Sequence, residues 1–361
     1  MRSLQDTLTG AGKAPLTSTF PDGSRLLMLP GNGRLLGLYP PDSDENVLWT
    51  HPALTTAAAA AAWFACPGWP NPGGDRTWLG PEIETFIGDL SRPAETYAVQ
   101  PALDPGNWKL TASATTKVVL TNETRVQLHR AKRHVGVRLV RTFTPAANPL
   151  PGASPARAGL RYAGYSLVTA LELEPQPDDV LVRLGIWNLL QLPQPGAMLI
   201  PTREPIRPRC FFGALAADEL IVAPRLVRWN MGAPGEDTKI GIQAHPLADR
   251  AGHLRETTTP GVWDLVIRQF AVDTAGPYVD ALWEPPHEAG WTFQACCVRA
   301  GTACFNELEY HVPAASTTTG ANVSRDASRC WAFRGPIDGV AEAARLLLGG
   351  AAEASVLTAA R

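Results

Sequence analysis

The sequence predicts an all-β protein, a large sandwich or barrel in which short strands follow one another along the chain. Short apolar runs, most of them rich in β-branched or aromatic residues, recur throughout the sequence. The 33 prolines and 32 glycines are spread over the 361 residues, which indicates many turns between strands and not a disordered segment. With 45% apolar and 18% charged residues, the chain has the composition of a packed globular protein.

The predicted strands are short apolar segments that are mostly bounded by Pro, Gly, Asn or Asp. In chain order they are Ser24–Leu29, Arg34–Tyr39, Lys117–Asn122, Arg125–His129, Val135–Phe143, Tyr165–Glu174, Val180–Asn188, Glu219–Trp229, Lys239–Ala244, Trp263–Ala271, Trp291–Arg299 and Asn306–Val312. A Pro-rich loop at 145–155 interrupts them, but strands of the same kind continue on both sides. We therefore expect a single domain over residues 1–361.

Two segments have the features of helices. Residues 54–64 are rich in alanine, which favours a short helix. Residues 336–348 begin with proline, carry an acidic residue early and apolar residues at helical spacing, and are followed by two glycines. We expect both helices to be packing elements, and the second to be a short C-terminal helix.

Charge and motif content exclude several classes of function. The formal net charge is −2 and no basic block is present, so binding to nucleic acid is not expected. The N-terminus lacks the apolar core of a signal peptide, and the longest apolar run, Ala57–Ala65, is too short to span a bilayer; we expect a cytoplasmic protein without membrane contact. Phosphate-loop, dinucleotide-binding, zinc-protease and serine-hydrolase motifs are absent, which argues against a nucleotide, nicotinamide or serine-hydrolase mechanism. No metal site is assigned, although these absences do not exclude a carboxylate-bound cation.

The segment at 305–313 carries the first group of candidate catalytic residues. On a strand, alternate residues point to one face, which places Phe305, Glu307, Glu309 and His311 together. Because neighbouring carboxylates repel, at least one pKa should be displaced, as a general acid paired with a general base requires. The alternative is the polar outer face of an ordinary half-exposed strand. As a surface carboxylate, Glu309 is expected to contribute little to stability.

The segment at 73–84 carries a candidate recognition site for a sugar. Two glycines precede Asp75, Arg76, Trp78 and Glu82, which combine carboxylates, a rigid fork of donors and a flat aromatic face. Sugars stack their C–H faces on aromatic rings and present hydroxyls to charged partners. The alternative is a tight glycine turn that leads into a strand whose Arg and Glu form a structural ion pair.

Three further residues are candidates for the same site. Lys239 is a lone cation at the start of a strand, and it either contacts a ligand or forms a salt bridge to a neighbouring strand. Trp283 stands beside Glu284, so that an aromatic face and a carboxylate are adjacent. The alternative for Trp283 is a place in the core, where most tryptophans lie.

Four short motifs resemble, in their order, a bacterial family allied to the galactose mutarotase-like proteins, the aldose 1-epimerases and their relatives. They are Gly-Gly-Asp-Arg-x-Trp-x-x-Pro-Glu at 73–82, Thr-Lys-Ile-Gly-Ile at 238–242, Tyr-Val-x-x-x-Trp-Glu at 278–284 and Glu-Leu-Glu at 307–309. The resemblance covers roughly residues 15–335. It implies an antiparallel β-supersandwich with a carbohydrate-binding concave face.

The resemblance also implies an aldose 1-epimerase-like sugar isomerase that needs no cofactor. In that chemistry Glu307 or Glu309 would be the base, and His311 or another histidine would be the acid. The remaining candidate residues would bind the carbohydrate: Asp75, Arg76, Trp78, Glu82, Lys239, Trp283 and Glu284. A glycoside hydrolase, a polysaccharide lyase and a non-catalytic carbohydrate-binding protein remain alternatives on the same fold. A Ca²⁺ ion held by Glu82, Glu307 and Glu309 also stays open.

Overall fold

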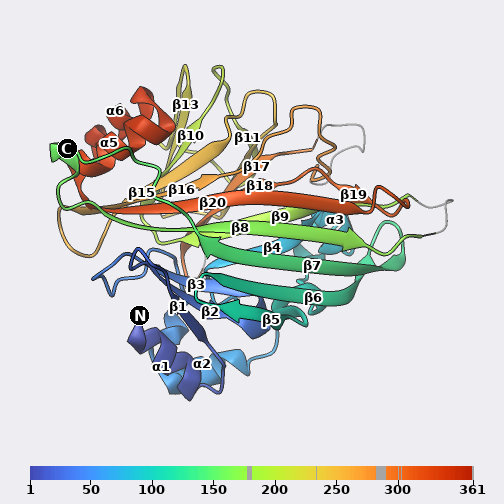
Figure 1. The fold of residues 1–361 in the computed structure, drawn as a ribbon. Helices are drawn as coiled ribbons and strands as arrows, with labels where there is room; N and C mark the ends of the chain where they lie inside the picture. Colours follow the sequence, from blue (N-terminus) through green and yellow to red (C-terminus); the bar gives the residue numbers. More distant parts are fainter. Residues whose placement is uncertain (177–180, 233, 282–289, 300, 302, 360–361) are drawn as a thin grey trace.

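The computed structural model describes residues 1–361 except 177–180, 233, 282–289, 300, 302 and 360–361 (Figure 1). Two ten-stranded sheets face each other, and all their strand pairs are antiparallel. The predicted all-β class and the antiparallel β-supersandwich are confirmed. The two sheets are called the site sheet and the back sheet below.

The site sheet begins at the N-terminal hairpins and carries the candidate residues on its central strands. Its strand order is β1-β2-β3-β4-β9-β18-β17-β14-β11, and β19 pairs with β9. The strands are β1 (Leu16–Thr19), β2 (Arg25–Leu29), β3 (Arg34–Tyr39), β4 (Asp75–Gly80), β9 (Arg183–Leu192), β11 (Arg209–Phe212), β14 (Thr238–Ile242), β17 (Phe293–Val298), β18 (Phe305–His311) and β19 (Ala315–Ser316).

The back sheet contains the longest strands of the molecule. Its order is β12-β13-β10-β15-β16-β20-β8-β7-β6-β5. The strands are β5 (Lys109–Ala114), β6 (Lys117–Leu128), β7 (Arg133–Pro145), β8 (Arg161–Leu173), β10 (Gly196–Pro201), β12 (Leu220–Ala223), β13 (Leu226–Met231), β15 (Arg250–Glu256), β16 (Val262–Gln269) and β20 (Val323–Pro336).

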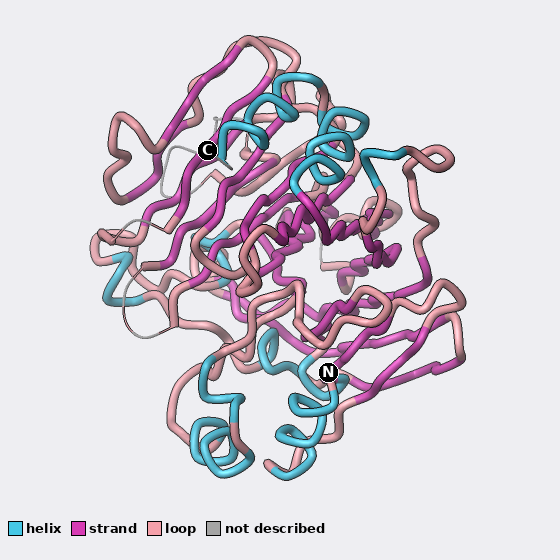
Figure 2. The backbone as a smooth tube through the Cα atoms, turned by 90° about the vertical axis from the view of Figure 1, so that its left-hand side faces the viewer, coloured by secondary structure: helices cyan, strands magenta, loops and turns pink. Residues whose placement is uncertain are grey.

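Helices cover parts of the outer faces of both sheets. They are α1 (Arg2–Gly10), α2 (Ala57–Phe64), α3 (Glu82–Thr85), α4 (Pro93–Thr96), α5 (Ile337–Leu348) and α6 (Gly350–Ala359). The helices α1 and α2 pack on β2 and β3, whereas α5 and α6 pack on the back sheet, so that the two groups lie at opposite ends of the molecule (Figure 2). None of these described helices is long and apolar enough to cross a membrane.

The predicted helices are confirmed, and four further helices, α1, α3, α4 and α6, were not predicted. Helix α2 begins after Thr56, whose hydroxyl oxygen accepts a hydrogen bond from the Ala59 backbone N–H at 3.2 Å. Helix α5 ends at Gly349, which has a φ of +98°, but α6 starts one residue later, although two glycines there indicated a stop. Helix α1 was missed as well.

Several strands that the sequence did not predict have polar or mixed buried faces, although β10, in which Met198, Leu199 and Ile200 are buried, was missed as well. The longest of them is β20, which points Ser324, Asp326 and Ser328 into the protein. Because these inward residues are polar, the alternation of apolar and polar residues that predicts a strand is absent. Predicted segments also changed bounds: 117–122 and 125–129 form the single strand β6, and 219–229 falls within the β12–β13 hairpin.

The main core lies between the sheets and fixes which face of the site sheet can hold a cavity. Leu190 of β9 and Leu308 of β18 point inward and join one hydrophobic cluster with Leu139 of β7 and Leu167 of β8. Since side chains alternate, the neighbours of these residues point outward. The outward face of the central strands is where the candidate residues gather.

Two glycines allow β4 to start in close contact with its neighbours. Gly73 and Gly74 have φ values of +99° and +79°, which side-chain-bearing residues rarely adopt. A Cβ on Gly74 would clash with the Leu35 carbonyl oxygen, and one on Gly73 would clash with the Trp49 carbonyl oxygen. The Gly-Gly pair therefore lets the chain pass between β3 and the segment before α2 and then enter β4.

Candidate active site

A cavity of about 940 Å³ opens on the outward face of the site sheet. Its lining comes from the central strands, from the segment between β3 and β4, and from α3 and α4. The aromatic lining residues are Trp49, Trp63, Trp69, Trp78, Tyr97, Trp187, Phe212 and Phe305. The charged lining residues are Arg76, Glu82, Glu236, Asp237, Lys239 and Glu307. The cavity thus combines many aromatic side chains with several charged ones, as ligand sites generally do.

The β18 strand brings its two glutamates together on the cavity side. Glu307 lies opposite Gln191 of β9 and Cys296 of β17, and Glu309 lies two residues further along the same face. Oxygens of the two carboxylates and the Cys296 sulfur all lie within 4.8 Å of one another. Glu307 lines the cavity, whereas Glu309 is fully buried behind it.

Arg76 of β4 reaches across β9 to the first of these glutamates. Its Nη2 donates to Glu307 Oε1 at 2.9 Å, and Gln191 Nε2 donates to the same oxygen at 3.0 Å. The guanidinium lies 4.1 Å from the centroid of the Trp78 ring and 5.4 Å from that of Trp69. Within the described part of the chain, Arg76 Nε and Nη1 have no hydrogen-bond partner although both are buried. These donors remain for a ligand.

Lys239 of β14 is shared between two carboxylates. Its Nζ lies 3.1 Å from Glu309 Oε2 and 3.7 Å from Glu82 Oε2, and it sits 4.6 Å from the centroid of a Trp187 ring. The Trp187 indole N–H donates to Glu309 Oε2 at 2.9 Å. With Arg76 and Glu307, the site therefore holds three buried carboxyl groups and two cations.

Burial makes two of these carboxyl groups hold protons far above their ordinary range. Desolvation raises the pKa of Glu82 to about 7 and that of Glu309 to about 8, although Lys239 opposes both shifts. One ammonium group cannot compensate two buried carboxylates, so Glu82 and Glu309 are each protonated in a large fraction of molecules near neutral pH. Tyr97 donates its hydroxyl proton to Glu82 Oε1 at 3.4 Å. An exchangeable proton is therefore present at the cavity wall.

The expectation that Glu309 is a surface carboxylate of little weight for stability is wrong. Its side chain is 0% exposed, and it bonds to Lys239 and Trp187.

We expect Glu309→Gln to weaken the pH dependence of stability. Glu309 keeps its proton in the native state where the unfolded chain, with its ordinary pKa near 4.5, has lost it. The contribution of Glu309 to the free energy of unfolding is therefore complete below about pH 4 and is lost as the pH rises through about 8.

The measurement is urea unfolding of the wild type and of Glu309→Gln at several pH values between about 5 and 8. The wild-type free energy of unfolding should carry a falling component of up to about 1.4 kcal/mol per pH unit that the variant lacks. Glu123→Gln, at a side chain that is 70% exposed, is the control and should leave the wild-type profile unchanged. Parallel profiles for the wild type and Glu309→Gln would contradict the burial effect.

His311 shares a face with the glutamates but does not reach the cavity. Its ring stacks on Trp187 with a centroid distance of 5.3 Å, and its Nε2 lies 3.5 Å from Asp280 Oδ2. The side chain is 2% exposed, and burial lowers the pKa of His311 to about 4 despite Asp280. At neutral pH it is an uncharged imidazole beneath Trp187, which separates it from the other candidate catalytic residues.

Asp75 also lies apart from the other candidate residues. It precedes Arg76 on β4 and therefore points into the space between the sheets. There it pairs with Arg141 of β7 and Arg268 of β16 and accepts a hydrogen bond from the Tyr165 hydroxyl. The structure places Asp75 as a link between the sheets, on the side of β4 opposite the cavity.

The remaining predicted binding residues divide into two groups. Arg76, Trp78, Glu82 and Lys239 all line the cavity. Trp78 additionally donates its indole N–H to Asp104 Oδ2 at 3.0 Å, which holds the ring in place. Trp283 and Glu284 lie outside the described residues.

Several cavity residues were not singled out from the sequence. Trp49, His51 and Trp63 come from the connection between β3 and β4, and Tyr97 follows α4. These residues follow no motif in the sequence, because they come together only when the connections that carry them fold over the sheet. The one available signal was the aromatic residue Trp63 near the end of an alanine-rich helix.

The buried side chains around Glu307 and Glu309 do not offer the oxygen ligands that Ca²⁺ requires. Among the described residues, the group of side chains close enough to share an ion is Cys296, Glu307 and Glu309. Ca²⁺ takes six to eight oxygen ligands, whereas this group offers a thiol and two carboxylates. Each carboxylate is already bound to a cation, Arg76 or Lys239. The structure therefore gives no support to the Ca²⁺ alternative.

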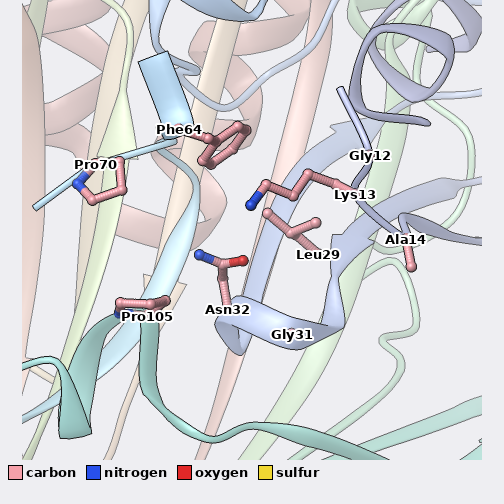
Figure 3. Close-up of a pocket in the computed structure, with 9 residues that line it drawn as sticks. All are labelled: Gly12, Lys13, Ala14, Leu29, Gly31, Asn32, Phe64, Pro70 and Pro105. Carbon is pink, nitrogen blue, oxygen red and sulfur yellow. The ribbon is translucent and has the colours of Figure 1, made fainter. Parts of the chain in front are cut away.

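A second cavity, of about 340 Å³, lies beside the turn after α1 (Figure 3). Lys13 extends into it toward Phe64, with the ammonium 4.3 Å from the ring centroid, and Asn32 lies on the opposite side. Lys13 is the ionisable residue among those that line it. Since it has no acid–base pair, this cavity is a weaker candidate for catalysis than the first.

Comparison with known proteins finds similarity only among solved structures. No family model matches the sequence, and no curated protein matches it. A galactose mutarotase-related enzyme from Lactobacillus acidophilus is 7% identical, with a TM-score of 0.44 over 90% of this chain and 98% of that chain. A GalM/aldose epimerase homologue from C. elegans is 9% identical, with a TM-score of 0.43 over 90% of this chain and 99% of the other.

Proposed function

We propose that the cavity binds a sugar and that the protein is an aldose 1-epimerase-like isomerase, which interconverts the anomers of its substrate. One observation carries the proposal. Glu307, held by Arg76, and Glu82, whose pKa burial raises to about 7, line the same aromatic cavity. Two carboxyl groups in unequal environments are what general acid–base catalysis needs near neutral pH.

The lining supports recognition of a polyhydroxylated ring. Trp69 and Tyr97, which line the cavity and are not buried, offer ring faces for the C–H groups of a pyranose, and the unpaired Nε and Nη1 of Arg76 can donate to its hydroxyls. Lys239 supplies a further donor at the same wall. The combination suits a ligand with apolar faces and a polar edge better than it suits a purely apolar one.

In the proposed reaction, Glu307 removes the proton from the anomeric hydroxyl while Glu82 gives its proton to the ring oxygen. The electron pair of the O–H bond forms the carbonyl, and the bond between the anomeric carbon and the ring oxygen breaks. Rotation about the adjacent C–C bond presents the other face of the carbonyl, and the reverse proton transfers close the ring. The two residues end in their starting states, so no cofactor or oxidant is consumed.

Glu82 takes the role of acid in this proposal in place of His311. An acid must carry a proton near neutral pH and must reach the ligand. Glu82 meets both conditions, whereas His311 is uncharged and lies beneath Trp187. Glu309 does not line the cavity, and it acts on the reaction through the charge of Lys239.

The test is the rate of exchange between the anomers of aldohexoses and aldopentoses, measured by two-dimensional exchange NMR with and without protein. The wild type should accelerate exchange for at least one aldose, and Glu307→Gln should lower that acceleration by about 10²–10⁴-fold. Glu123→Gln, far from the cavity and exposed, should keep the wild-type rate. An aldose that binds but exchanges at the rate of the buffer would contradict the proposal.

Non-catalytic carbohydrate binding is the second candidate, and one observation favours it. Glu307 Oε1 already accepts hydrogen bonds from both Arg76 and Gln191, as a carboxylate that only fixes the geometry of a binding site would. Binding without anomer exchange would establish this reading. Release of the phenol from aryl glycosides would point to a glycoside hydrolase, and unsaturated products from uronate polymers would point to a lyase.

A further inference from the structure

We propose that the cavity has a second subsite, formed by Trp49, His51, Trp63 and Phe305, that takes a second sugar ring, so that the ligand is a disaccharide or longer oligosaccharide. This inference rests on the proposed sugar-binding function and specifies its substrate class. All four side chains line the same cavity as Arg76 and Glu307. The subsite is called the aromatic subsite below.

The rings of the aromatic subsite form a continuous surface. His51 and Trp63 are stacked, with a centroid distance of 4.2 Å and an interplanar angle of 18°. Trp49 meets His51 edge-on at 5.9 Å and contacts Phe305 at 4.5 Å. His51 and Trp63 are only half-buried, so they remain accessible to a ligand. Flat, accessible rings of this kind are suited to stacking on the C–H face of a sugar.

The position of Phe305 on β18 sets the distance between the two ends of the cavity. Phe305 and Glu307 point to the same face, two residues apart, which corresponds to about 7 Å along a strand. A ring at the aromatic subsite is therefore displaced along β18 from a ring at the Arg76–Glu307 pair. The volume of about 940 Å³ lies near the upper end of the roughly 300–1,000 Å³ that drug-sized ligands occupy, and a monosaccharide is smaller than such ligands.

His51 provides the polar contact that favours a sugar over an apolar group. Its Nδ1 accepts a hydrogen bond from the Ala53 backbone N–H at 3.1 Å, so the proton of the neutral ring is on Nε2. Burial lowers the pKa of His51, which keeps the ring neutral at physiological pH. Among the described residues, Nε2 has no hydrogen-bond partner. A stacking plane with a free donor at its edge matches a hydroxyl-bearing ring.

The experiment compares the dissociation constants of matched ligands by calorimetry: glucose with maltose and cellobiose, and galactose with lactose. The wild type should bind at least one disaccharide about tenfold or more tightly than its monosaccharide. Trp63→Ala should weaken that disaccharide about five- to tenfold, the size of one stacking contact, and change the monosaccharide less than about twofold. Trp63→Phe keeps an aromatic plane and should restore most of the disaccharide affinity.

A second variant guards against an effect of Trp63→Ala on helix α2. His51→Asn keeps a side-chain oxygen that can accept from the Ala53 N–H and removes the imidazole ring. It should weaken the disaccharide selectively as well. Equal losses for the monosaccharide and the disaccharide in both variants, or no loss, would overturn the aromatic subsite and leave the proposed function standing. Failure of every sugar to bind the wild type would overturn both.

Discussion

Replacement of Asp75 by asparagine is expected to lower the free energy of unfolding by about 3–5 kcal/mol. The carboxylate is fully buried between the sheets and pairs with Arg141 and Arg268, which are also buried. The amide has no charge, so two guanidinium groups would lose their shared counter-ion in a place that water does not reach. Urea unfolding followed by tryptophan fluorescence and circular dichroism measures the effect.

Asp89→Asn is the matched control for this prediction. Asp89 also pairs with an arginine, Arg92 at 3.5 Å, but both side chains are exposed. Its replacement should change stability by no more than about 0.5 kcal/mol. If Asp75→Asn were as stable as the wild type yet had lost sugar binding, Asp75 would be a ligand contact, as its place in the 73–82 motif first suggested.

Replacement of Glu82 by glutamine is expected to slow anomer exchange by about 10²–10⁴-fold, with sugar affinity changed much less. Glutamine keeps the size of the side chain but has no proton to give to the ring oxygen. The dependence of the exchange rate on pH provides a second, independent test. Because the acid must be protonated, the wild-type rate should fall as the pH rises through about 7, the pKa to which burial raises Glu82. The variant should lack this decline.

Exchange NMR between about pH 5.5 and 8.5 measures both effects, and the neighbouring residue Glu84 offers the control. Glu84 lies on the same helix α3, but its carboxylate accepts hydrogen bonds from the Arg130 and Ala131 backbone N–H groups, away from the cavity. Glu84→Gln should keep the wild-type rate and pH profile. Full activity of the Glu82→Gln variant would show that another group acts as the acid.

The alternation of side chains on strands accounts for what the sequence could predict of the site. It placed Glu307 and Glu309 on one face of β18, and the structure has them there. The same rule, applied to adjacent residues, separates Asp75 from Arg76, so the inward position of Asp75 could have been predicted from β4 alone. Alternation does not say how far a cavity extends along a face, which is why His311 was grouped with the glutamates.

The fold was easier to predict where buried faces are apolar than where they are polar, although the apolar strand β10 was also missed. Strands such as β3 and β7 have leucine or valine on their buried faces and were found. β20 has serine and aspartate at the corresponding positions, and these become acceptable inside the protein only because residues such as Tyr310 bond to them. The part of the aromatic wall that Trp49, Trp63 and Trp69 form depends on how the connection between β3 and β4 folds over the sheet, and no local pattern encodes that path.

The strands of the site sheet carry most of the buried carboxyl groups and cations of the proposed site, whereas the connection between β3 and β4 carries most of the aromatic subsite. The residues proposed to react with the ligand are therefore separate from those proposed to select it. Arg76, Lys239 and Glu307 stand on paired strands, where a shift of one residue would turn them away from the ligand. The aromatic subsite, apart from Phe305, comes from a connection whose length and composition can vary without changing strand register. Substitutions within residues 49–69 are therefore the natural route to re-engineering which glycan the protein accepts, with its proton-transfer chemistry left in place.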